Sequence, residues 1–154
     1  MSIAYEEIAD LIENNRECVN VAVRGEGVHC EWIARAEQRL GILLPETYKW
    51  FLRNYGSGEI AGEEIFSIYE MPFEEAIGGD IVYNAIVNCQ NGNFGIDKLI
   101  ISTNGDEVFY FATSKPRDNF EYQVWKIDRI EGTEKLYADN FLEFLKKRIT
   151  FLCL

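Results

Sequence analysis

The sequence has little histidine and little proline, its cysteines are far apart in the chain, and it contains no long run of apolar residues. His29 is the only histidine among 154 residues, which argues against a metal site or a catalytic triad that uses histidine. The four cysteines show neither a CxxC pair nor the spacing of zinc ligands. No uninterrupted apolar stretch approaches the roughly 18 residues that a membrane span needs. These absences argue against most metalloproteins and against membrane-spanning proteins.

The cysteines are scattered among apolar neighbours, as Cys18, Cys30, Cys89 and Cys153. We expect them to be reduced and to behave as small hydrophobic residues. His29 is adjacent to Cys30, but neighbouring side chains on a helix point about 100° apart, which makes the two a poor nucleophile–base pair. The first residues have neither a basic region nor an apolar region, so no secretory signal is visible and we expect a cytoplasmic protein.

Motifs that would indicate catalysis or cofactor binding are missing. The sequence has no GxxxxGK[ST], GxGxxG, HExxH or GxSxG. The adjacent pairs 63–64 and 74–75 are not the alternating acidic loop that binds calcium. We therefore expect no enzyme, no catalytic residue, no cofactor, no metal and no small-molecule substrate, although two glutamates flanking a cleft could in principle support a small hydrolase.

The composition is that of a packed domain, with 47% hydrophobic and 14% aromatic residues. A chain of this length is most simply one domain, residues 1–154, and at about 150 residues it needs no disulfide or metal to stabilise its core. The hydrophobic spacing predicts an α+β domain, with an antiparallel sheet and helices packed at the N- and C-terminal ends.

The first half of the chain is predicted to be mostly helical. Residues 3–14 have the spacing of an amphipathic helix that Ser2 would cap, and residues 19–23 alternate like a short strand. A helix over residues 31–40 should end at Gly41, and the next should begin at Pro45 and run until Gly56.

The second half of the chain carries the strand signals. Residues 64–69 and 122–127 are predicted strands, and Gly78-Gly79-Asp80 is expected to cap a helix between them. Asn104-Gly105 predicts a hairpin turn with positive φ between two apolar strands. Asp139 should cap a last helix with Leu142, Leu145 and Ile149 facing inward and Lys146-Lys147-Arg148 near its C-terminus.

Negative charge is concentrated in the middle of the chain. The net charge is −11, and between Arg53 and Lys98 there is no lysine or arginine. Eight acidic residues lie in this interval: Glu59, Glu63, Glu64, Glu70, Glu74, Glu75, Asp80 and Asp97. They form either a solvated face that aids solubility or a patch that steers and docks a basic partner. So acidic a chain should repel phosphates, which disfavours direct binding of nucleic acid.

Most aromatic residues have core-facing spacing, and Trp50 is the exception. It falls at the edge of a predicted apolar stripe, between Tyr48 and Phe51, so we expect it to be partly exposed. Exposed tryptophans beside acidic residues are common anchors of protein interfaces.

Residues 32–52 read WIARAEQRLGILLPETYKWFL, a helix ending in LG, a hydrophobic LP and a helix reading YxxFL. This order resembles the opening motif of the SUKH superfamily. The strand block 106–127 and the FLEFL of residues 141–145 are similar to the C-terminal half of that family. The resemblance covers residues 30–150 and leaves residues 1–28 as an N-terminal helix and extended segment. Where family members commonly have an NGG-like run, this chain has Gly56-Ser57-Gly58.

The resemblance implies a bacterial immunity protein, that is, an antitoxin that binds a cognate toxin domain, often a nuclease, and blocks it. Its motif residues would support the fold, so no contact residue transfers from the family. Combined with the acidic segment, it leads us to expect that the protein covers the basic active face of its toxin partner. The candidate partner-binding residues are Glu59, Glu63, Glu64, Glu70, Glu74, Glu75, Asp80 and Trp50. The alternative is a general regulatory protein-interaction module without a toxin partner.

Overall fold

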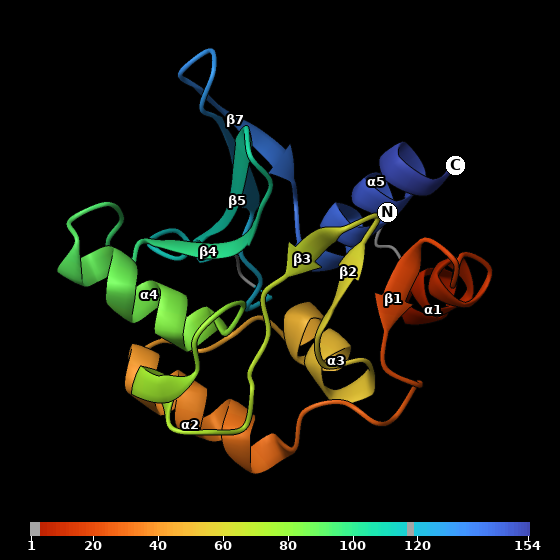
Figure 1. Cartoon of the computed structure of the whole chain (residues 1–154), viewed down its shortest axis with the longest axis horizontal. Coiled ribbons are helices and arrows are strands. Elements are labelled where there is room, and N and C mark those ends of the chain that lie inside the picture. The colour runs from red at the N-terminus through yellow and green to blue at the C-terminus, as the bar shows by residue number, and fades with distance from the viewer. Residues whose placement is uncertain (1–3, 117–118) are drawn as a thin grey trace.

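The computed structural model describes residues 4–116 and 119–154 (Figure 1). Over these residues it contains five α-helices: α1 (Tyr5–Glu13), α2 (Cys30–Leu40), α3 (Glu46–Asn54), α4 (Ile81–Gln90) and α5 (Phe141–Cys153). The strands are β1 (Val19–Val21), β2 (Gly58–Ile60), β3 (Glu63–Ile65), β4 (Lys98–Thr103), β5 (Glu107–Ala112), β6 (Val124–Asp128) and β7 (Thr133–Ala138). A 3₁₀ turn, η1 (Phe73–Glu75), precedes α4. The predicted α+β class is confirmed.

The strands form one antiparallel sheet in the order β1-β2-β3-β4-β5-β6-β7, the same as their order in the chain. Helices α2 and α3 are inserted between β1 and β2, whereas η1 and α4 are inserted between β3 and β4. The first three strands have three residues each, and the last four have five or six. Helix α1 packs beside α5 next to β1, so the two ends of the described chain meet (Figure 1).

A cluster of aromatic rings in the core lies between the sheet, α3 and α5. Phe109 and Phe111 alternate along β5 and therefore face the same side of the sheet. The Phe109 ring lies 5.2 Å from that of Phe144 in α5, and Phe111 lies 5.5 Å from Tyr48 in α3. Tyr48 in turn contacts Phe141 of α5 at 5.0 Å. These rings hold α3 and α5 against one face of the sheet, as their spacing predicted.

Most helix ends have the caps that the sequence indicates. Gly41 ends α2 with φ of 74°, and its N–H donates to the Glu37 carbonyl at 2.9 Å. Asp80 caps α4 by accepting from the Tyr83 N–H. Asn140, rather than the predicted Asp139, caps α5, because its Oδ1 accepts from the Glu143 N–H at 2.9 Å. Ser2 lies outside the described residues, and α1 begins after Ala4 without a side-chain cap.

Helix α3 is capped from a distant part of the chain. Pro45 is the residue just before the helix and has no side-chain hydrogen bond to offer its first turn. Glu121 supplies the missing acceptor: its carboxylate accepts from the Thr47 N–H at 3.2 Å and from the Thr47 hydroxyl. Glu121 is only 5% exposed, and this burial raises its pKa above the ordinary 4.5. The buried carboxylate therefore joins α3 to the chain before β6.

Three expectations about the strands were wrong in part. The predicted strand 64–69 pairs in the sheet only up to Ile65, because the chain then turns to hydrogen-bond Ser67 to Gly79. Neither Asn104 nor Gly105 has a positive φ. Instead, the Asn104 side chain accepts from the N–H groups of Asp106 and Glu107 and closes the turn. Strands β2 and β7 were not predicted.

Among the described helices, none combines the length and the apolar character that crossing a bilayer requires.

Candidate functional site

Two of the acidic candidates lie side by side on the sheet. Glu59 of β2 is paired directly opposite Glu64 of β3. Both occupy the face of the hairpin opposite to Ile60 and Ile65, whose side chains are buried. No basic side chain forms an ion pair with either glutamate among the described residues. Like charges directly opposite each other destabilise a strand pair, so this hairpin carries an uncompensated negative charge.

Asp80 is buried, which corrects its assignment as a partner contact, and Glu63 is largely engaged within the fold. Glu63 shares the inner face of β3 with Ile65, where its carboxylate binds Arg148 of α5 and accepts from the Asn104 amide. Asp80 is fully buried. It accepts from the N–H groups of Tyr83 at 2.8 Å and Tyr69 at 2.9 Å, and burial raises its pKa. The Asp80 carboxylate is therefore internal, whereas the Glu63 side chain is half-buried and paired.

Arg148 is also placed differently from the expectation. Helix α5 continues to Cys153, so Arg148 lies within the helix rather than at its C-terminal turn. Its guanidinium binds Glu63 and lies 4.8 Å from the centre of the Phe109 ring. With 5% exposure it is part of the core, and its charge compensates Glu63 instead of the helix dipole.

The remaining acidic candidates lie outside the sheet. Glu70 follows β3 and has a positive φ of 56°, which is unusual for a residue other than glycine. Its Oε1 accepts from the His29 backbone N–H at 2.7 Å and lies 2.9 Å from His29 Nδ1; the backbone hydrogen bond lowers the pKa of Glu70. Glu74 of η1 pairs with Arg39 at 3.1 Å, and Glu75 is exposed.

Trp50 is half-buried, in agreement with its predicted position at the edge of the helix stripe. Its ring lies 5.0 Å from that of Tyr5 and 5.9 Å from that of Tyr55. The tryptophan thus belongs to a small aromatic cluster between α1 and the end of α3.

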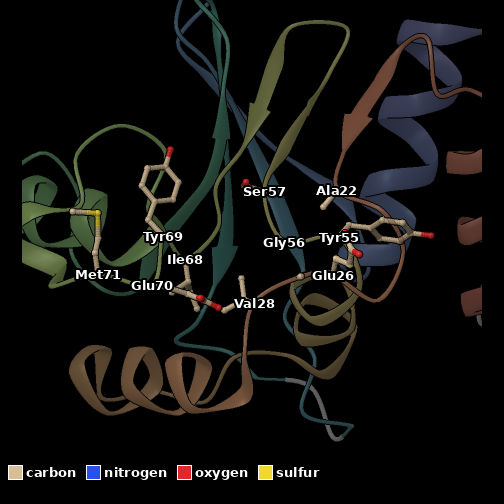
Figure 2. Close-up of a pocket in the computed structure, with 11 residues that line it drawn as sticks. Ala22, Glu26, Val28, Tyr55, Gly56, Ser57, Ile68, Tyr69, Glu70 and Met71 are labelled. Atoms are coloured by element: carbon tan, nitrogen blue, oxygen red, sulfur yellow. The ribbon is translucent and has the colours of Figure 1, made fainter.

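A pocket of about 450 Å³ includes one of the acidic candidates, Glu70, in its lining. It is formed by the segments 22–28, 55–57 and 68–71 (Figure 2). Figure 2 shows Tyr69 and Glu70 on one side and Tyr55 and Glu26 on the other, with Val28 between them. The charged side chains among the described lining residues are Glu26 and Glu70, both acidic. Apolar side chains, including Val28 and Ile68, line the pocket beside these two carboxylates.

The wall beside Glu26 exists because a loop caps the C-terminal end of α3. The N–H groups of residues 22, 25, 27 and 28 donate to the carbonyls of residues 55, 54, 53 and 52. This approach requires glycine at position 27, since a Cβ atom there would overlap the Leu52 carbonyl oxygen. Gly56, with φ of 70°, lies against Gly27. Sequence analysis marked Gly25-Glu26-Gly27 only as the end of a strand and did not identify Glu26 as a site residue.

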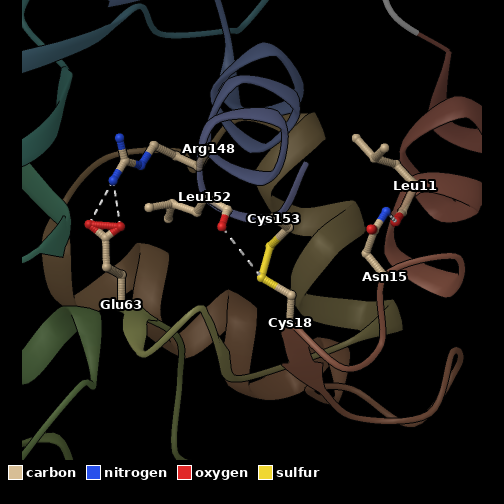
Figure 3. The surroundings of a disulfide bond; sticks show 7 residues. All are labelled: Leu11, Asn15, Cys18, Glu63, Arg148, Leu152 and Cys153. Carbon is tan, nitrogen blue, oxygen red and sulfur yellow. Dashed lines mark hydrogen bonds and ion pairs between the residues drawn. A yellow bond between two sulfur atoms is a disulfide. The ribbon is translucent and has the colours of Figure 1, made fainter.

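Two of the cysteines form a disulfide, which corrects the expectation that all four are reduced. Cys18, just before β1, is bonded to Cys153 at the end of α5, with a Cα–Cα distance of 5.9 Å (Figure 3). The two are 135 residues apart in the sequence. Cys30 and Cys89 are free and exposed.

The pocket combines two carboxylates with apolar side chains. His29 contacts Glu70 and not a thiol. Within residues 4–116 and 119–154, no three His, Cys, Asp or Glu side chains are placed to share a metal ion. Carboxylates beside an apolar pocket are suited to bind a cationic group.

The fold is shared with a solved structure and with a known family. A crystal structure of an uncharacterized protein from Salmonella enterica subsp. enterica serovar typhimurium str. 14028s matches with a TM-score of 0.51 and 18% sequence identity. The match covers 99% of this chain and 80% of that chain, and at this identity it concerns the fold alone. The profile of the SUKH_6 family, described as SMI1-KNR4 cell-wall, matches residues 30–145, from the start of α2 into α5. The chain therefore belongs to the SMI1-KNR4 family of the SUKH group.

Proposed function

We propose that this protein is an immunity protein that binds a cognate bacterial toxin domain and neutralises it. The observation that carries the proposal is the family match across residues 30–145. Immunity proteins of this group act by binding, which agrees with a site that offers carboxylates and an apolar pocket. The match leaves open which toxin is bound, so the chemistry of the partner must be inferred from the surface of this chain.

The surface favours a basic partner of nuclease type. We define the acidic surface as Glu59, Glu64, Glu70, Glu74 and Glu75. A nuclease binds phosphates through a positively charged face, and a set of carboxylates can cover that face by mimicking phosphate charge. The directly opposed Glu59 and Glu64 would contribute most to binding, because a cation placed between them removes their mutual repulsion.

A charge-reversal experiment tests this proposal. The triple variant Glu59→Lys, Glu64→Lys and Glu75→Lys changes carboxylates that form no ion pair among the described residues. In a tagged pull-down from the native host at low and moderate salt, we expect the parent to retain one stoichiometric basic partner that salt progressively releases. The variant should lose it, chiefly through slower association at low salt. Co-expression with the parent should then relieve the toxicity of that partner.

A matched control separates the acidic surface from net charge. The triple variant Glu17→Lys, Glu31→Lys and Glu131→Lys changes the charge by the same amount at exposed positions elsewhere. It should retain the partner. If both triple variants bind and protect like the parent, the acidic surface is not the interface. Many weak partners and no relief of toxicity would instead favour the regulatory interaction module.

A further inference from the structure

We propose that the pocket between residues 22–28, 55–57 and 68–71 receives one arginine side chain of the partner. This inference rests on the proposed function, since it supplies the basic partner, and it names the single contact at which that partner would be anchored. Buried arginines are frequent hot spots of protein interfaces. A pocket that encloses one of them would add specificity to the long-range attraction of the acidic surface.

The charges of the pocket suit a guanidinium. Glu26 and Glu70 line it from opposite sides, and no lysine, arginine or histidine is among its described lining residues (Figure 2). Both contacts of Glu70 with His29 use Oε1, so Oε2 has no hydrogen bond within the described part of the chain. The Glu26 carboxylate likewise has no ion pair there. A ligand cation would therefore meet two carboxylates without displacing a cation of this chain.

The shape favours a long side chain with a charged end. Val28 and Ile68 line the pocket and offer apolar surface to a methylene stem, as the stems of long cationic side chains require. The guanidinium has five donors in a planar fork and can bind carboxylates on two sides, whereas a lysine ammonium is a compact point charge.

The position of Glu70 is fixed by contacts with His29. Glu70 has a positive φ of 56°. The two contacts with His29 fix it there and hold its carboxylate at the pocket.

Small arginine derivatives can test the pocket without the toxin. Backbone amide NMR shifts would be followed while N-acetyl-arginine methylamide is added, with N-acetyl-citrulline methylamide as the uncharged isostere. We expect saturable shifts at Gly27, Gly56, Tyr69 and Glu70 with the arginine compound only. Equal shifts with citrulline, no saturation, or shifts spread over all acidic residues would overturn the proposal.

Two isosteric variants assign the effect to the carboxylates. Glu26→Gln and Glu70→Gln should each weaken arginine binding about threefold, and together about tenfold, as expected for partly exposed charge pairs. Glu70→Gln keeps an oxygen acceptor for His29, and the dispersion of the amide spectrum reports whether each variant is folded. Glu131→Gln, in the β6–β7 turn, is the matched control and should bind like the parent.

The pocket and the proposed function can fail separately. If Glu59→Lys with Glu64→Lys and Glu75→Lys abolishes capture of a toxin while the two glutamine variants bind arginine and toxin like the parent, the arginine pocket is wrong and the immunity role stands. If arginine binds and the glutamine variants weaken it, but no toxin is captured or neutralised, the pocket stands and the immunity role is wrong.

Discussion

At the residue scale, the buried carboxylate of Glu121 makes stability depend on pH. Burial raises its pKa above 4.5, so the folded chain holds this proton more tightly than the unfolded chain. The resulting stabilisation is present below about pH 4.5 and is lost as the pH rises through the folded-state pKa. Glu121→Gln cannot titrate. The unfolding free energy of the variant relative to the parent should therefore rise between about pH 4 and about pH 7, as urea titrations would show.

Glu70 provides the control with the opposite sign. Its pKa is lowered by the hydrogen bond from His29, so its stabilisation is present above about pH 4.5 and is lost as the pH falls. The unfolding free energy of Glu70→Gln relative to the parent should therefore be highest at low pH. Any change that glutamine makes in these hydrogen bonds adds a constant offset, so the slope of the unfolding free energy with pH is the quantity to compare. Equal slopes for the two variants would contradict the assignment of their pKa shifts.

The sequence could have distinguished inward-facing from outward-facing carboxylates, which a count of charges cannot do. Glu63 and Glu64 are neighbours in a strand, and strand alternation places them on opposite faces, one with Ile65 in the core. Asp80 was expected both to cap α4 and to bind a partner, and it can do only the first because the cap buries it. The ion pair of Glu63 with Arg148 could not be predicted, because the two are 85 residues apart and belong to different elements.

At the scale of elements, the loop 22–28 is fitted to the end of α3 by Gly27. The substitution Gly27→Ala places a methyl group against the Leu52 carbonyl and should lower the unfolding free energy by about 2 kcal/mol or more, because backbone must move. It should also perturb the pocket, whose wall this loop forms. Gly105→Ala is the control, since a Cβ atom there meets nothing within 4 Å, and it should change the melting temperature little.

The strands that were missed show where hydrophobic patterns fail. Strand β2 begins at Gly58 and has three residues, too few to show alternation. Strand β7 is the last strand of the sheet, and its central residues Glu134, Lys135 and Leu136 are exposed, so charge is present at positions where a central strand would be apolar. The helices, which are longer and have one apolar face, were predicted within a few residues of their ends.

At the scale of the whole molecule, the disulfide joins the first strand to the last helix. Removing it with Cys18→Ser frees the end of α5 and should cost about 2–4 kcal/mol of stability, which corresponds to a fall of roughly 10 °C in melting temperature. Thermal unfolding with and without a reducing agent measures this loss. Cys30→Ser and Cys89→Ser remove exposed thiols and should have no such effect. A parent that melts alike in both conditions would contradict a stabilising disulfide.

The family motif predicted the fold better than it predicted the site. Residues 32–52 encode a C-cap glycine, a proline at the start of a helix and core aromatics, and all of these are local signals. The pocket is assembled from three segments that are far apart in the chain, and the acidic residues around it are set by tertiary contacts. The composition therefore predicted that the chain is acidic. Only the fold shows that Glu59 and Glu64 face outward, whereas Glu63 and Asp80 face inward.

The cysteine pair also fixes the order of events during synthesis. Cys18 leaves the ribosome early, and its partner follows 135 residues later. During that interval Cys30 and Cys89 are the thiols that an oxidising enzyme would find first. The native cross-link can close only after α5 has been made, because Cys153 lies at the end of that helix.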